Sequence, residues 1–385
     1  MTPDTLAQLT RLRHELHQYP EISGQEEQTA ARIADELRAR GADQVLTGIG
    51  GHGVAGVFDS GQAGPTVAIR CELDGLPIQE ISAADYASRV PGKGHLCGHD
   101  GHMTMVLGVA EHLAQTRPET GRVVLIFQPA EETGQGAIAF RADPTFAEIA
   151  PDFVFALHNL PGLAQGNVLL CQGPANCASR GMKIVLTGKT SHAAAPQDGI
   201  SPAEALATLM PQLAEMGKGG TLDAKFALTT VTHASLGEPT FGVAPGQAEL
   251  WVTLRTVADA RMQDLMNEAE AFVARVASDQ GLGCEIVYED VFEACANAPE
   301  TVDILSRSCA AMGMPCELTP SPQKFSEDFG QFGKGAKSAM FWLGSGVDHP
   351  QLHNPDYDFP DALIPVGTGV FLAAIQRVLG PLNPR

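Results

Sequence analysis

The stretch GHLCGHDGHMTM at residues 94–105 gathers a thiol, a carboxylate and three imidazoles. A disulfide needs a second cysteine, and a lone nucleophile does not need three imidazoles, whereas a metal site would use nearly all of these groups. Cys97 and His99 are two positions apart, and in extended backbone such side chains face the same way. Borderline-soft divalent metals accept sulfur and nitrogen donors of this kind. The alternative is a polar turn in which Asp100 caps a helix that begins near Met103.

A pair of adjacent carboxylates forms the second chemical feature. In FQPAEETGQGA, residues 127–137, an apolar strand leads into Glu131 and Glu132. Adjacent residues outside a helix project in different directions. One carboxylate can therefore bind a metal while the other acts as a general base toward a metal-bound water. Taken alone, the pair is also typical of a solvated acidic strand end.

Two segments that carry histidine follow later in the chain. His158 closes the apolar strand at 153–160, and HPQLHNPDYDF at 349–359 brings His349 and His353 just before a final helix. The carboxyl ends of parallel strands are where α/β sheets build their sites, although a single histidine there is more often only hydrogen-bonded. The combined donors exceed the roughly three that one catalytic zinc takes from protein. We therefore expect a two-metal site, with the thiolate as the bridge, formed by Cys97, His99, Glu132, His158 and His353.

Apolar patterns predict the elements that position these residues. Leucines at helical spacing predict a helix over 4–18, and short apolar runs that end near glycine or proline predict buried strands. Helical patterns such as 103–116 lie between some of these runs, which indicates an α/β sheet with helices on both faces. The expected strands cover residues 54–58, 66–73, 123–127 and 153–160.

The middle of the chain has a different pattern. Its order of elements, βα, ββ, αβ, predicts a compact two-layer α+β domain inserted at 181–293. Residues 1–180 and 294–385 would then form the catalytic domain, with the C-terminal segment completing its mixed sheet. Within the insertion, strands are expected over 182–194, 226–236, 248–257 and 284–292, and helices over 201–216 and 258–280.

Composition limits the classes of partner. The chain has 385 residues, a hydrophobic content of 44% and a formal net charge of −20. That length suits two domains, and that charge repels nucleic acid and anionic membranes. The eight cysteines are scattered without framework spacing, which indicates reduced thiols in a cytoplasm. The N-terminus has no apolar signal core, and we expect no apolar run of transmembrane length.

With these motifs in this order, the sequence resembles the amidohydrolase branch of the metallo-aminoacylase and carboxypeptidase clan. That branch includes hippurate hydrolase, auxin–amino acid conjugate hydrolases and N-acyl-amino-acid deacetylases. The resemblance covers essentially the whole chain and implies a zinc-exopeptidase-like sheet domain with an inserted lid that mediates a dimer. It is carried by LRHELHQYPEISGQEEQTA, AIRCELDGLPIQE, GHLCGHDGHMTM, FQPAEE, LHNLPG, TGKTSHAAAPQDGISP, FSEDFGQF and HNPDYDF.

The resemblance also implies a role for each residue. The five donors would hold two divalent metals, zinc or manganese by preference, with cobalt or nickel as alternatives. Glu131 would take a proton from the metal-bridging water and pass it to the leaving amine. His192, in the inserted domain, would steady the oxyanion or substrate, often in the site of a partner subunit; the alternative is a hydrogen-bonded turn histidine. Asp74 is expected to orient a ligand, and Asp100 and His102 either do likewise or only cap the helix.

The chain departs from the family pattern in several places, and the departures in the lid bear on the substrate end of the site. Glu72 stands where the family has the first aspartate of RADMD, and Gly242 stands where it has a lid asparagine. The stretch 211–225 lacks an expected arginine, while Arg255 of the LRT motif remains and is expected to contact substrate. The missing lid groups commonly bind the carboxylate end of the substrate. We therefore expect intact metal chemistry and an unusual amine half.

The predicted activity is hydrolysis of the amide bond of a small N-acyl amino acid or related conjugate, by attack of a metal-bridging hydroxide with Glu131 as general base and acid. A dipeptidase or carboxypeptidase of the same clan is the first alternative, disfavoured by Cys97 because those relatives usually bridge their metals with aspartate. A cysteine-nucleophile amidase using Cys97 would leave the other donors unexplained. A metal-bearing binding protein would not need Glu131.

Overall fold

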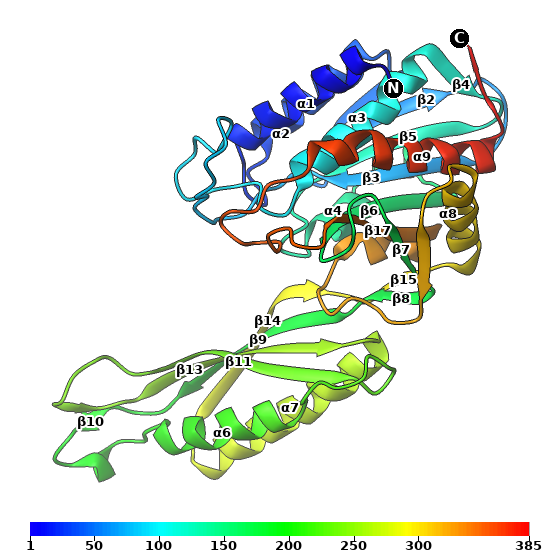
Figure 1. Ribbon diagram of the computed structural model, residues 1–385. Coiled ribbons are helices and arrows are strands. Elements are labelled where there is room, and N and C mark those ends of the chain that lie inside the picture. Colours follow the sequence, from blue (N-terminus) through cyan, green and yellow to red (C-terminus); the bar gives the residue numbers. More distant parts are fainter. Residues whose placement is uncertain (385) are drawn as a thin grey trace. The chain divides into compact units, whose positions relative to one another are not determined.

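The computed structural model describes residues 1–384 and separates into two compact units (Figure 1). The larger unit comprises Met1–Ala175, Cys295–Pro320 and Asp328–Arg385, and the inserted unit comprises Asn176–Ala294 and Ser321–Glu327. The predicted insertion did not include the short segment 321–327. This segment joins the inserted unit because Gln323 bridges to Asn176 and its carbonyl accepts a hydrogen bond from the Cys177 amide at 3.1 Å.

The larger unit is built on one eight-stranded mixed sheet. In sheet order its strands are β1 (Gln44–Ile49), β2 (Gly53–Asp59), β5 (Arg122–Gln128), β3 (Thr66–Glu72), β6 (Phe153–Pro161), β17 (Lys337–Gly346), β7 (Val168–Cys171) and β16 (Cys316–Thr319). The central pairs β5–β3, β3–β6 and β6–β17 are parallel, while β1–β2, β2–β5 and β17–β7 are antiparallel. The C-terminal segment supplies β16 and β17, so the expectation that it completes the mixed sheet is confirmed.

Helices cover both faces of this sheet, which confirms the predicted fold class. Along β5, Val123, Leu125 and Phe127 join one hydrophobic core, whereas Val124 and Ile126 are buried outside it, on the other face. The helices of that first core are α1 (Pro3–Gln18), α2 (Glu27–Ala39), α3 (His99–Gln115), α8 (Pro299–Ala311) and α9 (Ile364–Leu379). Outside it, α4 (Gly136–Ala142) and η2 (Asp328–Lys334) pack through Phe140 and Phe332, whose ring centroids are 6.1 Å apart.

The inserted unit is a four-stranded antiparallel sheet in the order β11-β13-β9-β14, packed against two helices (Figure 1). The alternation of apolar and polar side chains along β9 determines which face of the sheet the helices cover. Met182, Ile184 and Leu186 are buried against the helices, while Lys183, on the opposite face, is only half-buried. The chain order is β9 (Ala178–Thr187), α6 (Ala203–Glu215), β11 (Ala227–Leu236), β13 (Gln247–Thr256), α7 (Asp259–Asp279) and β14 (Gly283–Phe292).

Short elements complete both units. In the inserted unit, β10 (Ser191–His192) pairs with β12 (Val243–Ala244) as a separate ribbon. The others are β4 (Thr116–Pro118), α5 (Phe146–Ile149), β8 (Gly173–Asn176), η1 (Pro196–Asp198), β15 (Cys295–Asn297), η3 (Asp361–Leu363) and β18 (Leu382–Pro384).

The final helix contradicts the expectation that no apolar run reaches transmembrane length. The stretch Asp361–Leu379 is a 19-residue helical stretch with a mean hydropathy of 1.7, long and apolar enough by length and composition to cross a membrane. Half of its most apolar window is buried within the described structure. Its contacts are those of a core helix, because α9 lies against α3 and Thr368 Oγ1 donates a hydrogen bond to the Met105 carbonyl at 2.9 Å.

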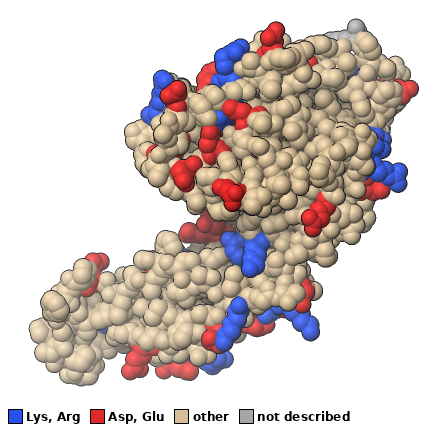
Figure 2. All heavy atoms as spheres, viewed as in Figure 1, with Lys and Arg blue, Asp and Glu red and all other residues tan. Residues whose placement is uncertain are grey.

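Acidic side chains are scattered among basic and uncharged ones over the face that Figure 2 shows. The net charge of −20 is therefore not gathered into one acidic patch on this face. This distribution is typical of a solvated surface and gives no support to a polycationic partner.

Candidate metal centre

The segment before α3 places two donors by means of a sharp bend. His99 is the first residue of α3, and Gly98 before it has a φ of +91°. A Cβ on Gly98 would lie 2.4 Å from Asn159 Oδ1, so only glycine fits this bend. The backbone between Cys97 and His99 is therefore bent, and the expectation of an extended backbone there is wrong. Cys97 and His99 nevertheless reach one cluster of donor atoms, in which Cys97 Sγ lies 3.4 Å from His158 Nε2.

The turn after β5 directs two carboxylates to one imidazole. Ala130 has a φ of +51°, a left-handed conformation that turns the chain sharply just before Glu131 and Glu132. Glu131 Oε2 lies 3.9 Å from His99 Nε2, and Glu132 Oε1 lies 4.0 Å from the same nitrogen. Glu131 is only 5% exposed. The two neighbouring acids thus reach the same imidazole from one tight turn.

The two later histidines complete the cluster from other elements. His158 lies in β6, where its Nδ1 donates to the Asn159 carbonyl at 2.8 Å and leaves Nε2 facing the thiol. His353 lies in the loop before α9, is 49% exposed at its side chain and has a φ of +65°. Its amide donates to the Leu96 carbonyl at 2.8 Å, and its Nε2 lies 3.5 Å from Glu132 Oε2.

The donor atoms form overlapping groups that fit metal ions. Atoms of Cys97, His99 and His158 lie within 4.8 Å of one another, and so do atoms of Cys97, Glu132 and His353. His99 Nε2 and Glu132 Oε1 are buried without a hydrogen-bond partner, which is unusual for polar atoms. Their separation of 4.0 Å leaves room for a cation bonded to each at about 2.0–2.2 Å. Cys97 belongs to two groups, as a bridging ligand would.

The electrostatics of the cluster favour a cation. Burial, with Glu132 and Glu131 beside it, raises the pKa of the Cys97 thiol well above its usual range. Burial and the neighbouring His102 hold the pKa of His158 well below its usual value, so its ring is neutral and able to donate a lone pair. Burial alone would lower the pKa of His99, but the carboxylates of Asp74, Glu72 and Glu132 raise it to about 10. A proton or a divalent metal would neutralise the same carboxylates.

Asp74 supports the donor cluster through hydrogen bonds to two of its residues. Its backbone carbonyl accepts a hydrogen bond from His99 Nδ1 at 2.8 Å, and its Oδ1 lies 3.5 Å from the same nitrogen. Its Oδ2 accepts from the Glu132 amide at 3.0 Å and from Ser23 Oγ at 2.7 Å. The residue therefore fixes the tautomer of one donor and the backbone of another, as a supporting carboxylate does in metal sites.

The unusual Glu72 is held in a buried ion network. It pairs with Arg70, and its Oε2 lies 2.7 Å from His102 Nδ1. Arg70 also donates to Asp328 Oδ1 at 2.6 Å, so one buried guanidinium is shared by two buried carboxylates. His102 Nε2 contacts Asn159 Oδ1 at 2.6 Å. Both ring nitrogens of His102 are thus engaged by protein groups, which gives it a supporting position instead of a cap.

Comparison with known proteins decides the family. Residues 68–377 match peptidase family M20/M25/M40 over most of the chain. This chain belongs to that family. Hippurate hydrolase of Campylobacter jejuni is 30% identical over 94% of this chain and 94% of its own length. An N-acetyl-L-cysteine deacetylase of Bacillus subtilis is 30% identical over 97% of this chain and 88% of its own.

A solved structure agrees with this assignment. A dinuclear metal-binding peptidase of the M20 family from Bacillus subtilis superimposes with a TM-score of 0.82 at 26% identity, covering 98% of this chain and 99% of that one. The predicted resemblance to the amidohydrolase branch is confirmed, and this M20 chain is a hydrolase by its relatives. In the M20 chain, the donor cluster described above lies wholly within the larger unit.

The position of Asp100 differs from the one expected. It was predicted to orient a metal ligand or to cap α3, but Gly98 is the N-cap and Asp100 lies inside the first turn. Its Oδ2 contacts His17 Nδ1 at 2.8 Å and Arg13 Nη1 at 3.3 Å, both from α1. Arg13 also pairs with Asp358 at 2.6 Å. Asp100 therefore ties the N-terminal helix to the helix that carries His99.

The inserted unit holds the other predicted residues. His192 is exposed, and its Nδ1 accepts a hydrogen bond from the Ala194 amide at 3.0 Å. Gly242 is its neighbour, since the Gly242 carbonyl accepts from the Ala193 amide at 3.0 Å. Arg255 Nη1 donates to the Lys324 carbonyl at 3.0 Å, a contact that holds the segment 321–327.

Some supporting residues escaped the sequence reasoning although a signal was present. Arg70 and Glu72 are charged residues within an otherwise apolar strand, which predicts an internal ion pair. Arg13 and His17 are four positions apart on the leucine face of α1, which predicts buried charge on a helix. Asn159 gave no signal beyond its place after His158.

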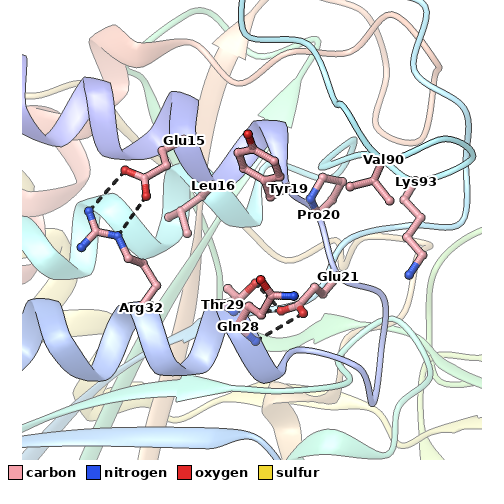
Figure 3. Close-up of a pocket in the computed structure, with 10 residues that line it drawn as sticks. All are labelled: Glu15, Leu16, Tyr19, Pro20, Glu21, Gln28, Thr29, Arg32, Val90 and Lys93. Atoms are coloured by element: carbon pink, nitrogen blue, oxygen red, sulfur yellow. Dashed lines mark hydrogen bonds and ion pairs between the residues drawn. The ribbon is translucent and has the colours of Figure 1, made fainter.

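A surface cavity of about 400 Å³ lies apart from this chemistry, between α1 and α2 (Figure 3). Its charged residues already have partners: Arg32 Nε contacts Glu15 Oε1 at 3.2 Å, and Glu21 Oε2 accepts from the Thr29 amide at 2.8 Å. None of the five predicted metal donors lines it. The cavity therefore gives no alternative location for the reaction.

The buried His17 predicts that stability depends on pH. Burial alone would lower the pKa of His17, but the charge of Asp100 and hydrogen bonds with Asp100 and Glu80 raise it to about 9. A raised folded-state pKa stabilises the protein fully below the unfolded value of about 6.5, and this contribution is lost as pH rises through the folded value. We expect the free energy of unfolding to fall by on the order of 3 kcal/mol between these limits. Denaturant titrations of wild type and His17→Gln check this, because the variant should lack that step.

Proposed function

We propose that this M20 chain is a dinuclear-metal amidohydrolase that cleaves the amide bond of small N-acyl amino acids or related conjugates. The observation that carries the proposal is the overlapping set of sulfur, nitrogen and oxygen donors, buried except for Glu132 and His353, with the buried Glu131 beside it. The relatives named hippurate hydrolase and N-acetyl-L-cysteine deacetylase support this substrate class.

Each donor has a distinct place in the proposed centre. Cys97 would bridge the two ions, His99 and His158 would supply imidazole nitrogen, and Glu132 with His353 would complete the set. Zinc or manganese is the proposed metal, because this mixture of thiolate, imidazole and carboxylate suits first-row divalent ions. Bound metal would polarise the substrate carbonyl and make water acidic enough to attack at neutral pH.

Glu131 would move the proton. Its carboxylate lies beside the donor cluster, and Glu132 rather than Glu131 joins the group with Cys97 and His353. Glu131 can therefore accept a proton from the attacking water and donate it to the departing amine nitrogen. This shuttle uses one buried carboxylate in both its charged and its neutral forms.

The structure gives no support to a cysteine-nucleophile amidase. A nucleophilic cysteine needs a depressed pKa and a protonated histidine beside it. Here the pKa of Cys97 is raised by burial and by nearby carboxylates, and burial lowers the pKa of His158 at 3.4 Å. Both directions oppose a thiolate–imidazolium pair between Cys97 and His158.

The proposed dimer would use the inserted unit. Strand β11 is an edge strand of its sheet, and its second half is exposed from Thr232 to Leu236. An exposed edge strand with apolar side chains is a template for pairing with a second copy. His192 would then be supplied to the partner's site. We also keep the cytoplasm as the proposed compartment, since all eight cysteines are free thiols in the described structure.

The first test combines metal content with a substrate panel. We expect about two divalent ions per chain by elemental analysis, hydrolysis of N-acetyl or N-benzoyl amino acids, loss of activity with a chelator and recovery on adding zinc or manganese. Glu131→Gln should keep the metal and lose about 10²–10⁴-fold in kcat, because only the proton shuttle is removed. Glu317→Gln, an exposed acid at the sheet edge, is the control.

Two results would oppose the proposal. Activity that survives complete metal removal would restore Cys97 as the nucleophile. Preference for unblocked dipeptides over every N-acylated compound would assign the chain to the dipeptidases of its clan.

Gly242 provides a test of substrate preference. A Cβ at this position meets nothing within 4 Å, so an asparagine fits without strain beside His192. If the missing amide normally binds the substrate carboxylate, Gly242→Asn should raise kcat/KM for N-acyl-α-amino acids by about threefold to tenfold, the value of one added hydrogen bond. Gly283→Asn is the matched control, because Gly283 lies in the same unit, has no positive φ, and a Cβ there would make only ordinary contacts with Thr187. An unchanged order of substrates would show that Gly242 does not set specificity.

The dimer can be tested with two residues of equal exposure. Leu236 on β11 and Val287 on β14 are each 40% exposed, but they lie on opposite edge strands. We expect Leu236→Lys to convert the dimer to a monomer in light scattering, because a buried lysine charge at an interface is costly. Val287→Lys should remain dimeric. Equal behaviour of the two variants would exclude the β11 edge as the interface.

A further inference from the structure

Glu26 is a buried carboxylate that the proposed reaction does not use. Its side chain is 0% exposed, and it occupies the N-cap position of α2 without capping the helix through its side chain. Its Oε2 is buried and has no hydrogen-bond partner. Burying a carboxylate costs free energy unless strong contacts compensate. The contacts of its other carboxylate oxygen therefore need an explanation.

One contact of Glu26 reaches across the chain to the turn that carries the reacting acids. Its Oε1 accepts a hydrogen bond from the Ala130 amide at 2.8 Å and another from the Gly24 amide at 2.9 Å. Ala130 is one of three non-glycine residues with positive φ among those described, at +51°. Such a conformation persists only where surrounding contacts determine it. The carboxylate of Glu26 is one of those contacts.

The turn is held at two further points. The Ala130 carbonyl accepts from the Gly136 amide at 3.0 Å, and a Cβ on Gly136 would lie only 1.6 Å from the Pro129 oxygen. The Glu132 amide donates to Asp74 Oδ2 at 3.0 Å. Two buried carboxylates thus hold the backbone amides on either side of Glu131, and Glu26 holds the strained one.

We propose that Glu26 is a positioning residue that keeps Ala130 in its left-handed conformation and thereby aims the Glu131 carboxylate at the reacting water. The inference rests on the proposed amidohydrolase function and deepens it. Asp74 secures Glu132 independently, so loss of Glu26 should disturb proton transfer more than metal binding. The required property is an oxygen acceptor at this position, and a charge is not required.

Four variants test this assignment. Glu26→Ala removes the acceptor, whereas Glu26→Gln keeps an acceptor oxygen of the same reach without the charge. The double variant Glu26→Ala with Ala130→Gly replaces the strained residue by one that adopts positive φ freely. Glu21→Ala is the matched control from the same segment, because Glu21 accepts from the Thr29 amide at the start of α2 and does not touch the turn (Figure 3).

The expected results separate positioning from general support of the fold. Glu26→Ala should lower kcat by about tenfold to a hundredfold with KM and metal content little changed, because small misplacements of a reacting group have effects of this size. Glu26→Gln should stay within about threefold of wild type, and the added glycine should recover at least part of the loss. Hydrogen exchange of the segment 129–133 should become faster in Glu26→Ala and stay slow in Glu26→Gln and Glu21→Ala.

Several outcomes would overturn the proposal. These are an unchanged kcat in Glu26→Ala, metal loss in proportion to activity, equal damage by Glu26→Gln, or no recovery with glycine. If Glu26→Ala does not fold, Ala130→Val tests the same turn without touching Glu26, since a β-branched residue resists positive φ and should lower kcat with metal retained. A different result would separate the two proposals. If the wild type hydrolyses no amide but hydrogen exchange of the segment 129–133 is still faster in Glu26→Ala, the proposed function is wrong and the positioning role of Glu26 is retained.

Discussion

The architecture of the larger unit depends on one constraint, which is the placement of several carboxylates around a shared buried space. Glu131 and Glu132 both face His99, and Asp74 stands behind the same ring. Like charges in a medium of low polarity repel strongly unless a cation lies between them. The protein brings sulfur and imidazole donors to this space instead of lysine or arginine. This choice leaves the neutralising charge to a proton or to a bound cation.

The positively charged side chains lie next to the donor cluster and not within it. Arg70 pairs with both Glu72 and Asp328 beneath the cluster, and Arg13 and His17 pair with Asp100 at its side. Each arginine joins segments that are far apart in the chain. Arg13 joins α1 to the loop before α9, and Arg70 joins β3 to η2. These ion pairs contribute little net stability, but breaking one would leave an unpaired buried charge, so they specify how the segments assemble.

The sequence was sufficient for elements whose signal is local. Apolar runs and leucine spacing predicted β3, β5, β6 and α1 closely, and the βα, ββ, αβ order predicted the elements of the insertion. The donor residues were recognisable because thiol, imidazole and paired acids are rare together. Their joint placement was not derivable from spacing alone, since Cys97 and His99 meet through a glycine bend.

Long-range contacts account for what the sequence did not reveal. Asp100 was expected near the metals or at a helix cap, and its true partners lie on α1, more than eighty residues earlier. The segment 321–327 joins the inserted unit through a few backbone contacts that leave no periodic pattern. Glu26 resembles any acid near a helix start until its distance to the Ala130 amide is known. Tertiary pairing of isolated polar residues has no local signature.

The position of β17 has a consequence for how the chain is made. This strand lies between β6 and β7 in the sheet, yet it begins at Lys337, after the whole inserted unit. On the ribosome, β6 must wait with an open edge until the last strand emerges, while the inserted unit can already bury its own core. The first paired residues of the two strands, Phe153 and Lys337, are 184 positions apart in the chain. During that interval the unpaired edge of β6 is open to wrong pairing and aggregation.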